Sequence, residues 1–246
     1  RKTTSYFNTE KAIHCLKESN SPMANRRLGQ IYDPHYKDDG FDAYKTDAAA
    51  ALTQIADENR FIQLKETYGP EMVVGLMKLD GATVGAIANS KEGVLSTAGC
   101  KKAEQFVYFC DSFGIPVITL TNVKEYASSM EEEKTISQAV ADMMYAFASA
   151  DIPKINVITG EAYGSAYVAM NSKHVGADLV LALDSAKVGV MDATVAAQVM
   201  CQDEIAKEAD TKSALEEKAK EFEALQNGAE GAARRGYVDN VIEGTS

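Results

Sequence analysis

Small residues gather in the middle of the stretch VITGEAYGSAYVAMNSKHVGADLVLAL, which begins at Val157. Gly164, Ser165 and Ala166 carry little side chain to block the approach of a ligand to their backbone N–H groups. The first turn of a helix leaves such N–H groups without partners, and the helix dipole adds partial positive charge there. A turn of this composition can hold an oxyanion without any titratable side chain. The alternative is that the small residues only let a helix pack closely on a sheet.

This chemistry needs a strand that leads directly into a helix. The apolar residues of Lys154–Thr159 predict the strand, and a helix is expected over about Ala162–His174. The predicted helix has a first turn in which the small residues stand next to the strand. The sequence therefore places its best candidate site at a strand-to-helix turn.

The histidines give weaker signals. His14 and His35 match no metal-ligand spacing, and the chain contains no H-E-x-x-H motif. His174 follows Lys173 at the end of the predicted helix, where a capping or packing role is favoured over catalysis. We therefore predict no metal site.

Three further segments are interpreted as structural. Glu92–Cys100 lacks the terminal G-K-[ST] of a phosphate-binding loop and is predicted to be a flexible loop. Met130–Lys134 is interpreted as a solvated helix start, and Ala233–Gly236 as a surface helix end rather than a phosphate site.

Composition limits the partners. The 246 residues include 36 acidic and 25 basic side chains, a formal net charge of −11, which argues against nucleic acid as a general partner. The four cysteines form no C-x-x-C pair and are expected to be reduced. No apolar run approaches the length of about 18 residues that a membrane helix needs, and no signal peptide is visible. We therefore expect a cytoplasmic protein.

The remaining patterns predict one α/β domain. Residues 1–46 are interpreted as an arm and linker with a short helix near Thr9–Glu18, and residues 47–246 as the domain. Three strand candidates from Phe61 onward include a hairpin at Asp80–Gly81. Strands and helices alternate from Lys101, which indicates βαβ units with parallel strands.

Five stretches resemble, in order, the C-terminal half of biotin-dependent acyl-CoA carboxyltransferases. They are RFIQLKETYGPEMVVGLMKLDGATVGAIAN, GCKKAEQFVYFCDSFGIPVITLTNV, KINVITGEAYGSAYVAMNSKHVGADLVLAL, AKVGVMDATVAAQVM and GAARRGYVDNVIE. The likeness is greatest to methylmalonyl-CoA decarboxylase alpha subunits and propionyl-CoA carboxylase beta subunits. It implies an α/β crotonase-like fold, a spiral of sheet repeats with surrounding helices.

The resemblance also implies a role for the small-residue turn. Where the family carries Y-G-G-A-Y, this chain carries Tyr163–Tyr167, and a serine replaces the second glycine. The family chemistry moves a carboxyl group between biotin and an acyl-CoA, and backbone N–H groups stabilise the enolate-like biotin ureido oxygen. On this basis the catalytic residues are Gly164, Ser165 and Ala166, with donors on Ser165 and Ala166, and the biotin-binding residues are Tyr163, Tyr167 and Val168.

A second departure from the family lies upstream. Many relatives carry D-x-P-G-F after the strand that ends near Leu120, in a loop near biotin, whereas this chain reads TNVKEY there. The proline and glycine of that loop are therefore missing.

The partners implied by the resemblance are an acyl-CoA substrate, a biotin carboxyl carrier protein and an N-terminal carboxyltransferase half. A homo- or hetero-oligomer built on a threefold ring is expected, and attachment to a membrane decarboxylase complex is left open. Two alternatives remain: an acyl-CoA hydratase or isomerase of the crotonase fold, and a non-catalytic scaffold of a biotin complex. The long charged helix predicted over Asp210–Gln226 would suit a scaffold.

Overall fold

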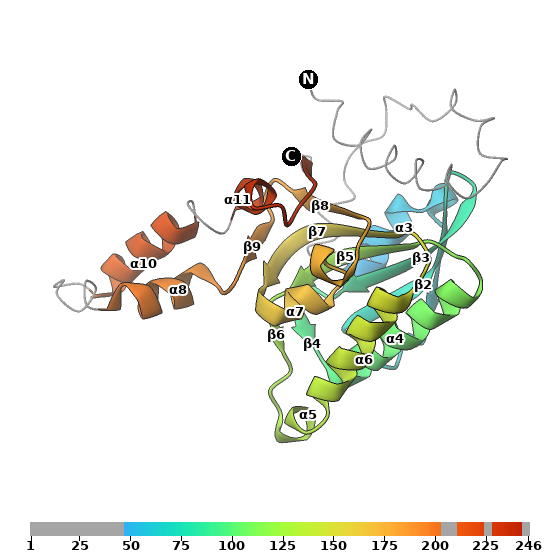
Figure 1. Ribbon diagram of the computed structural model, residues 1–246, viewed down its shortest axis with the longest axis horizontal. Coiled ribbons are helices and arrows are strands. Elements are labelled where there is room, and N and C mark those ends of the chain that lie inside the picture. The colour runs from blue at the N-terminus through green and yellow to red at the C-terminus, as the bar shows by residue number, and fades with distance from the viewer. Residues whose placement is uncertain (1–46, 203–210, 224–227, 243–246) are drawn as a thin grey trace.

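The computed structural model describes residues 47–202, 211–223 and 228–242 (Figure 1). The predicted arm over residues 1–46 and its helix at Thr9–Glu18 lie outside the described residues, so the domain boundary stays a prediction. The helical elements are α3 (Ala48–Ile55), η2 (Asp57–Asn59), α4 (Thr97–Ser112), α5 (Met130–Glu133), α6 (Ile136–Ser149), α7 (Gly164–Ala169), η3 (Lys173–Val175), α8 (Ala193–Met200), α10 (Thr211–Phe222) and α11 (Ala229–Arg234). The strands are β1 (Phe61–Leu64), β2 (Met72–Leu79), β3 (Ala82–Asn89), β4 (Val94–Leu95), β5 (Val117–Val123), β6 (Glu125–Tyr126), β7 (Lys154–Tyr163), β8 (Leu179–Leu183), β9 (Lys187–Gly189) and β10 (Asn240–Ile242).

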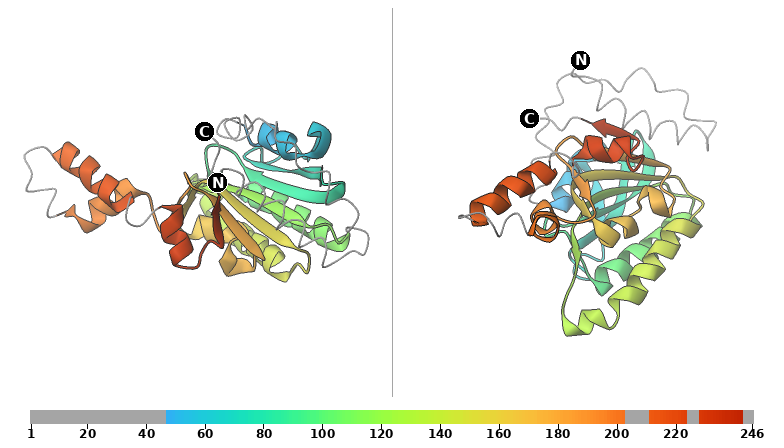
Figure 2. Two further views of the ribbon diagram at one scale, coloured as in Figure 1. Left: turned by 90° about the horizontal axis from the view of Figure 1, so that it is seen from above. Right: turned by 60° about the vertical axis from the view of Figure 1, so that its left-hand side comes forward.

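The main sheet is mixed, with the strand order β1-β2-β3-β5-β7-β8-β10, and β9 pairs with the end of β7. Helix α3 covers one face of this sheet, and α4 and α6 lie side by side on the other (Figure 2). Strands β4 and β6 form a second, two-stranded sheet. This layered arrangement buries most residues of β5 and β7, polar residues such as Thr119, Thr121 and Asn156 included.

The predicted hairpin is confirmed. β2 and β3 pair antiparallel along their whole length, and Asp80 and Gly81 connect them with φ angles of 51° and 74°. Two positive φ angles in a two-residue connection are those of a type I′ turn, which Asp-Gly favours.

The predicted alternation of strands and helices is also present in the structure. β3, β5, β7 and β8 are parallel neighbours, with α4 between β3 and β5 in the chain and α6 between β5 and β7. Parallel neighbours need crossover connections of this kind. The βαβ prediction is therefore confirmed.

The start of α4 differs from the prediction. The helix begins at Thr97 rather than Lys101, and Ser96 caps it by accepting a hydrogen bond from the Gly99 N–H at 3.0 Å. Two residues of the preceding segment, Val94 and Leu95, form β4. The prediction of a flexible loop over Glu92–Cys100 is therefore wrong, because a strand and a capped helix start occupy most of it.

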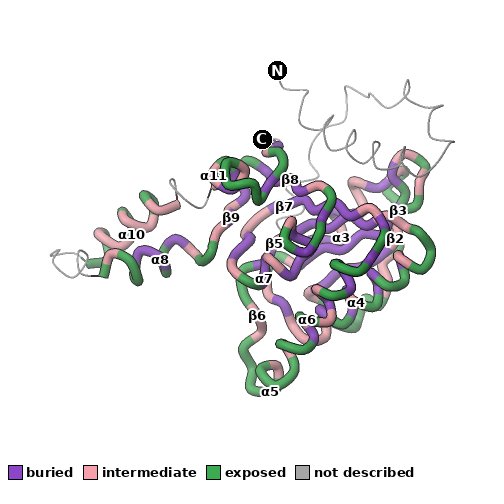
Figure 3. Tube along the Cα trace, in the orientation of Figure 1, coloured by how far each residue is buried: buried purple, intermediate pink, exposed green. Residues whose placement is uncertain are grey.

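Helices α8 and α10 pack on each other and extend away from the sheet (Figures 1 and 3). The segment that leads into α8, and α8 itself, expose large apolar side chains, among them Val190, Val199 and Met200. We call α8 and α10 together the α8–α10 arm, which is distinct from the arm predicted over residues 1–46. A short segment joins the α8–α10 arm to β9, the strand that pairs with the last residues of β7.

Candidate active site

The strand that leads into the small-residue turn is longer than predicted. β7 continues to Tyr163 instead of ending at Thr159, because β9 pairs with its last residues from Glu161 to Tyr163. Backbone groups that find partners in a neighbouring strand keep the extended conformation. The extension of β7 therefore depends on β9, which comes later in the chain and could not be recognised from the residues of β7 alone.

The helix after the turn is correspondingly shorter than predicted. α7 spans Gly164–Ala169, whereas the sequence predicted a helix over Ala162–His174. Gly164 has a φ angle of +59°, which turns the chain from strand into helix, and Asn171 (φ +45°) directs it away again. Lys173–Val175 form a separate turn, η3. The small residues thus lie in the first turn of α7, as expected, but that helix is only six residues long.

The first turn of α7 is open. Its N-cap residue, Tyr163, makes no side-chain capping bond. Ser165 is exposed and Gly164 is half-buried, whereas Ala166 as a whole is only 3% exposed. The N–H groups of a first helical turn have no acceptor within the helix. The exposed part of this turn is therefore Ser165, with Gly164 partly accessible beside it.

The first turn of α4 is different, because side chains already occupy it. The Thr97 N–H donates to Glu132 Oε2 at 2.7 Å, and the Gly99 N–H donates to the Ser96 hydroxyl. The Ser96 hydroxyl in turn contacts the Glu71 carboxylate. Two carboxylates at this helix start would repel a further anion. Of these two helix starts, only that of α7 is available to an oxyanion.

Tyr163 and Tyr167, predicted to bind biotin, are both buried, with 5% and 4% of their surface exposed. Neither hydroxyl has a hydrogen-bond partner among the described residues. Burial raises the pKa of both phenols, that of Tyr167 to about 12, so both stay protonated at neutral pH. Val168 is half-buried. Tyr167 packs in the hydrophobic core and attaches α7 to it, whereas Tyr163 is not part of that core.

A buried polar network fixes the end of α7 to the sheet. Asn156 on β7 donates from Nδ2 to the Met170 carbonyl at 3.2 Å, and its Oδ1 accepts from Thr119 and Thr121 on β5. Asn171 Nδ2 donates to Thr119 Oγ1 at 3.1 Å. Because these groups are buried, breaking one bond leaves an unsatisfied polar atom in the core. The network therefore makes α7 a rigid part of the fold.

Tyr126, a residue that the sequence did not single out, lies near the candidate site. It ends β6, and β6 lies beside α7. Burial raises the pKa of the Tyr126 phenol, which is therefore protonated. Tyr126 belongs to the segment TNVKEY, where the sequence departs from D-x-P-G-F.

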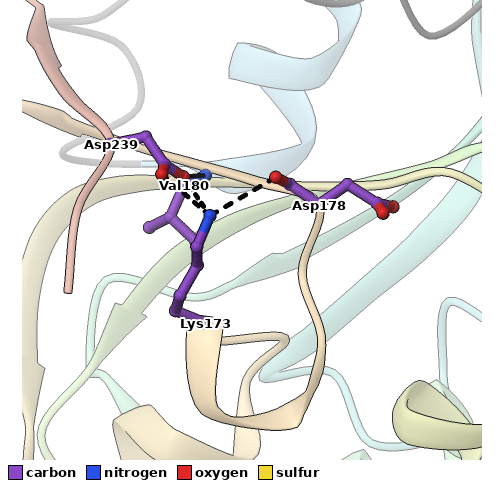
Figure 4. Close-up of polar contacts among 4 residues, drawn as sticks. All are labelled: Lys173, Asp178, Val180 and Asp239. Atoms are coloured by element: carbon purple, nitrogen blue, oxygen red, sulfur yellow. Dashed lines mark hydrogen bonds and ion pairs between the residues drawn. The ribbon is translucent and has the colours of Figure 1, made fainter. Parts of the chain in front are cut away.

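Lys173 and His174 have structural contacts. Lys173 Nζ lies 2.7 Å from Asp239 Oδ2 and 3.4 Å from the Asp178 carbonyl, and Asp239 also accepts the Val180 N–H at 2.8 Å (Figure 4). The His174 ring packs against that of Tyr237, with the ring centroids 5.2 Å apart and the planes tilted by 38°. The predicted packing role for His174 agrees with these contacts.

Two further properties of the described residues bear on function. They contain no group of three or more His, Cys, Asp or Glu side chains that could hold a metal ion. No helix among them has the length and apolar character needed to cross a membrane. His14 and His35 lie outside the described residues.

Comparison with known proteins gives consistent matches. The carboxyl transferase domain family matches residues 9–246. Similar proteins include the propionyl-CoA carboxylase beta chain of Saccharopolyspora erythraea, 37% identical over 204 residues, covering 80% of this chain and 37% of that protein. The methylmalonyl-CoA decarboxylase subunit alpha of Propionigenium modestum is 33% identical over 196 residues, covering 78% and 38%. The chain thus spans about two fifths of the length of the curated relatives it matches.

Among solved structures, the transcarboxylase 12S hexamer with methylmalonyl-CoA and methylmalonic acid bound is similar, with a TM-score of 0.76 at 35% identity. The match covers 80% of this chain and 39% of that one. The beta subunit of Pseudomonas aeruginosa geranyl-CoA carboxylase, 22% identical, has a TM-score of 0.69 and shares the fold. These neighbours are carboxyltransferases of the crotonase-like fold, so the α/β crotonase-like fold expected from the sequence is confirmed.

Proposed function

The chain belongs to the carboxyl transferase domain family, and we propose that it is the biotin-side half of a biotin-dependent acyl-CoA carboxyltransferase. Its relatives include propionyl-CoA carboxylase beta chains and a methylmalonyl-CoA decarboxylase subunit. By analogy the acyl group is propionyl or methylmalonyl. The observation that carries the proposal is the open first turn of α7 at the position of the family motif.

The residues at this turn fit biotin chemistry. Bound carboxybiotin would lose its carboxyl group as CO₂, which leaves negative charge on the ureido nitrogen and oxygen, and the nitrogen would then take up the α-proton of the acyl-CoA. The N–H groups of Ser165 and Ala166 would stabilise the charge on the oxygen before that proton arrives. The peptide donors need no change of protonation state. The protein therefore contributes preorganised donors, and its reaction needs no acid or base at this turn.

Other parts of the site hold these donors in place. Tyr167 packs α7 into the hydrophobic core, and the Asn156 network fixes the other end of α7 at Met170. Gly164 keeps the approach to the N–H groups free of a side chain. We expect Val168, half-buried one turn later, to contact an apolar part of biotin.

The proposal requires partners. Since the chain spans about two fifths of its relatives, an acyl-CoA half and a biotin carrier protein must be supplied. The exposed apolar residues of the α8–α10 arm and its base, Val190, Val199 and Met200, lie on the segment that follows β9 and suit burial against such a half. We expect a homo- or hetero-oligomer built on a threefold ring. We propose that the protein is located in the cytoplasm. Because the P. modestum relative is a decarboxylase subunit, binding to a membrane decarboxylase complex should also be tested.

The first experiment is binding of free biotin to the 246-residue chain, followed by carboxyl transfer between biotin and methylmalonyl-CoA with a relative's acyl-CoA half added. We expect binding by the chain alone and turnover only in the mixture. Absence of biotin binding would favour the scaffold, and turnover of acyl-CoA by the chain alone would favour a hydratase or isomerase.

Substitutions of Ser165 test the donors themselves. Because the Ala166 side chain is buried, an obstructing residue there would overpack α7, whereas Ser165 is exposed. Ser165→Leu obstructs the turn and Ser165→Pro deletes one N–H, so each should lower the transfer rate by about 100-fold or more. Ser165→Gly keeps the N–H and should lose far less. Ala148→Leu, on the exposed face of α6, controls for the added side chain. A loss with Ser165→Gly as large as with Ser165→Pro would assign the chemistry to the hydroxyl.

A further inference from the structure

Contacts at both ends of α4 and α6 set the register of these two helices, which lie side by side (Figure 2). At the two starts, the Thr97 hydroxyl oxygen lies 2.9 Å from that of Thr135. At the two ends, Asp111 Oδ1 accepts the N–H of Asp151, just past α6, at 2.9 Å. The helices therefore run parallel, and residues equally far along the chain from Thr97 and Thr135 lie at the same level.

Two carboxylates face each other across the helix pair. Glu104 and Asp142 each follow the respective threonine by two turns of helix, so they lie on the facing sides of α4 and α6. Both residues are half-buried. Asp142 Oδ1 accepts a hydrogen bond from Gln138 at 2.8 Å, but within the described part of the chain neither carboxylate forms an ion pair with a lysine or arginine. Burial and the nearby Asp142 raise the pKa of Glu104.

Two tyrosines flank these carboxylates at the surface. Tyr108 follows Glu104 at i+4 on α4, and Tyr145 follows Asp142 at i+3 on α6, which are the spacings of neighbours on a helix surface. Tyr108 is 39% exposed and Tyr145 is 67% exposed. We call Glu104, Tyr108, Asp142 and Tyr145 the α4–α6 patch.

The chemistry of the α4–α6 patch suits a guanidinium group. The face of a tyrosine ring attracts a cation, and arginine makes such contacts more often than lysine. The planar guanidinium also pairs with carboxylates through two N–H groups at once. One arginine can therefore use both kinds of side chain that the patch presents.

Charge complementarity favours a basic segment of another protein over a second copy of this chain. The chain carries a formal net charge of −11, so two copies repel each other where both are acidic. A segment with positive charge is attracted to the same place. An exposed group of aromatic side chains beside polar ones is also what a protein interaction site presents.

We propose that the α4–α6 patch is a docking site for an arginine-bearing segment of a partner protein. The guanidinium groups of that segment lie over Tyr108 and Tyr145 and pair with Glu104 and Asp142. The docking site lies on the helices that cover one face of the sheet, and the inference does not depend on the biotin chemistry proposed for α7.

The test is a titration of the 246-residue chain with acetyl-tetra-arginine amide, followed by the NMR shifts of the backbone amides. We expect the largest shift changes in α4 and α6. Glu104→Gln combined with Asp142→Asn should raise the Kd by about fivefold or more, because the charge-assisted hydrogen bonds are lost. Tyr108→Ala combined with Tyr145→Ala should raise it by about threefold or more.

Two controls separate the patch from the overall negative charge. Glu66→Gln combined with Tyr68→Ala removes an equally exposed carboxylate and tyrosine after β1, and should leave the Kd within about 1.5-fold of the wild-type value, since distant charges are screened. The same peptide with citrulline, which has the shape of arginine without its charge, should not saturate the chain.

Three results would overturn the proposal. Shift changes spread over the whole surface, or a loss in the Glu66/Tyr68 control as large as in the patch variants, would mean that net charge alone attracts the peptide. Equal binding of the citrulline peptide would mean that the positive charge plays no part. Sedimentation of the chain without peptide tests the other occupant: self-association that is abolished by Tyr108→Ala with Tyr145→Ala would assign the patch to a second copy instead.

Discussion

Asn122 provides an acceptor for Glu161 where the pairing of β5 with β7 is interrupted. The Glu161 N–H donates to Asn122 Oδ1 at 3.0 Å, within an irregularity in which the register shifts between Thr121 and Val123. The same amide group donates from Nδ2 to the carbonyls of Ser90 and Lys91 at 3.2 and 3.3 Å. One side chain thus connects the last part of β7, which leads into α7, with the segment after β3.

The position of the Asn122 side chain leaves no room for a side chain at residue 160, so glycine is required there, which gives the first prediction. A Cβ atom on Gly160 would lie 2.5 Å from Asn122 Oδ1. We expect Gly160→Ala to lower the free energy of unfolding by about 1–3 kcal/mol, through overpacking. Asn122→Ala should cost about 1–3 kcal/mol, because it leaves the Glu161 N–H without its acceptor.

The double variant decides whether the two effects have one origin. With the Asn122 side chain gone, the added methyl of Gly160→Ala meets no carbonyl oxygen there. Denaturant unfolding should therefore show the double variant to be more stable than the sum of the single changes predicts, by about 0.5 kcal/mol or more. Strict additivity would show that the Gly160 requirement has another cause.

Local patterns predicted much of the fold. The alternating strands of β2 and β3, the turn at Asp80–Gly81 and the apolar runs of β5 and β7 follow from nearby residues. The predictions that were wrong concern features that depend on residues distant in the sequence. β7 reaches Tyr163 because β9 pairs with it, and α4 begins at Thr97, where Glu132 accepts a hydrogen bond from its N–H.

The same distinction holds for the candidate site. Gly164, Ser165 and Ala166 were placed at a helix start by local composition and by the family motif, and the structure has them there. The position of Tyr126 near α7 requires the small β4–β6 sheet, whose strands of two residues each leave almost no periodic signal. The burial of Tyr163 and Tyr167 also follows from how α7 packs on the sheet rather than from the motif.

The second prediction concerns Asp239, which links η3 to β8. Asp239 pairs with Lys173 and accepts the Val180 N–H, and the charged side chains of the pair are each 35% exposed. Lys173→Met should cost no more than about 1 kcal/mol, as expected for a partly exposed ion pair. Asp239→Ala should cost about 1–3 kcal/mol, because the N–H of the buried Val180 then loses its acceptor.

Asp239→Asn is the matched variant, since it removes the charge and keeps an oxygen acceptor. Its unfolding free energy should lie between those of the wild type and Asp239→Ala. If Lys173→Met were as damaging as Asp239→Ala, the ion pair rather than the backbone contact would be the main contribution.

The third prediction uses the buried thiols. Burial raises the pKa of Cys100 and Cys110 to about 12, with the nearby Glu71 and Glu132 carboxylates adding to the shift at Cys100. A folded-state pKa above the unfolded value means that the stabilisation is fully present below about pH 8.5. It is then lost as the pH rises toward 12. Stability should therefore fall across this range.

Thiol labelling checks the same burial at one pH. In a Cys15→Ser, Cys201→Ser chain, Cys100 and Cys110 should not react with a disulfide reagent at pH 8 until denaturant is added. The thiolate is the reactive form, and a protonated, buried thiol supplies almost none of it. Rapid labelling of the native chain would contradict the burial of both residues.

The last prediction concerns Gly164, which starts α7 with a φ angle of +59°. A Cβ atom there would lie 3.1 Å from the Val190 carbonyl oxygen, in the segment before the α8–α10 arm. Gly164→Ala should lower the free energy of unfolding by about 1–2 kcal/mol, since left-handed backbone is unfavourable for a residue with a side chain. It should also raise the Kd of biotin, because a shift that relieves the contact moves the first turn.

Gly114→Ala is the matched control: Gly114 has a φ angle of +63°, but nothing lies within 4 Å of an added Cβ. Gly114→Ala should lose comparable stability in denaturant unfolding and leave biotin binding intact. If both variants bound biotin like the wild type, the geometry at Gly164 would matter for folding alone. The assignment of the first turn of α7 as the oxyanion site would then be wrong.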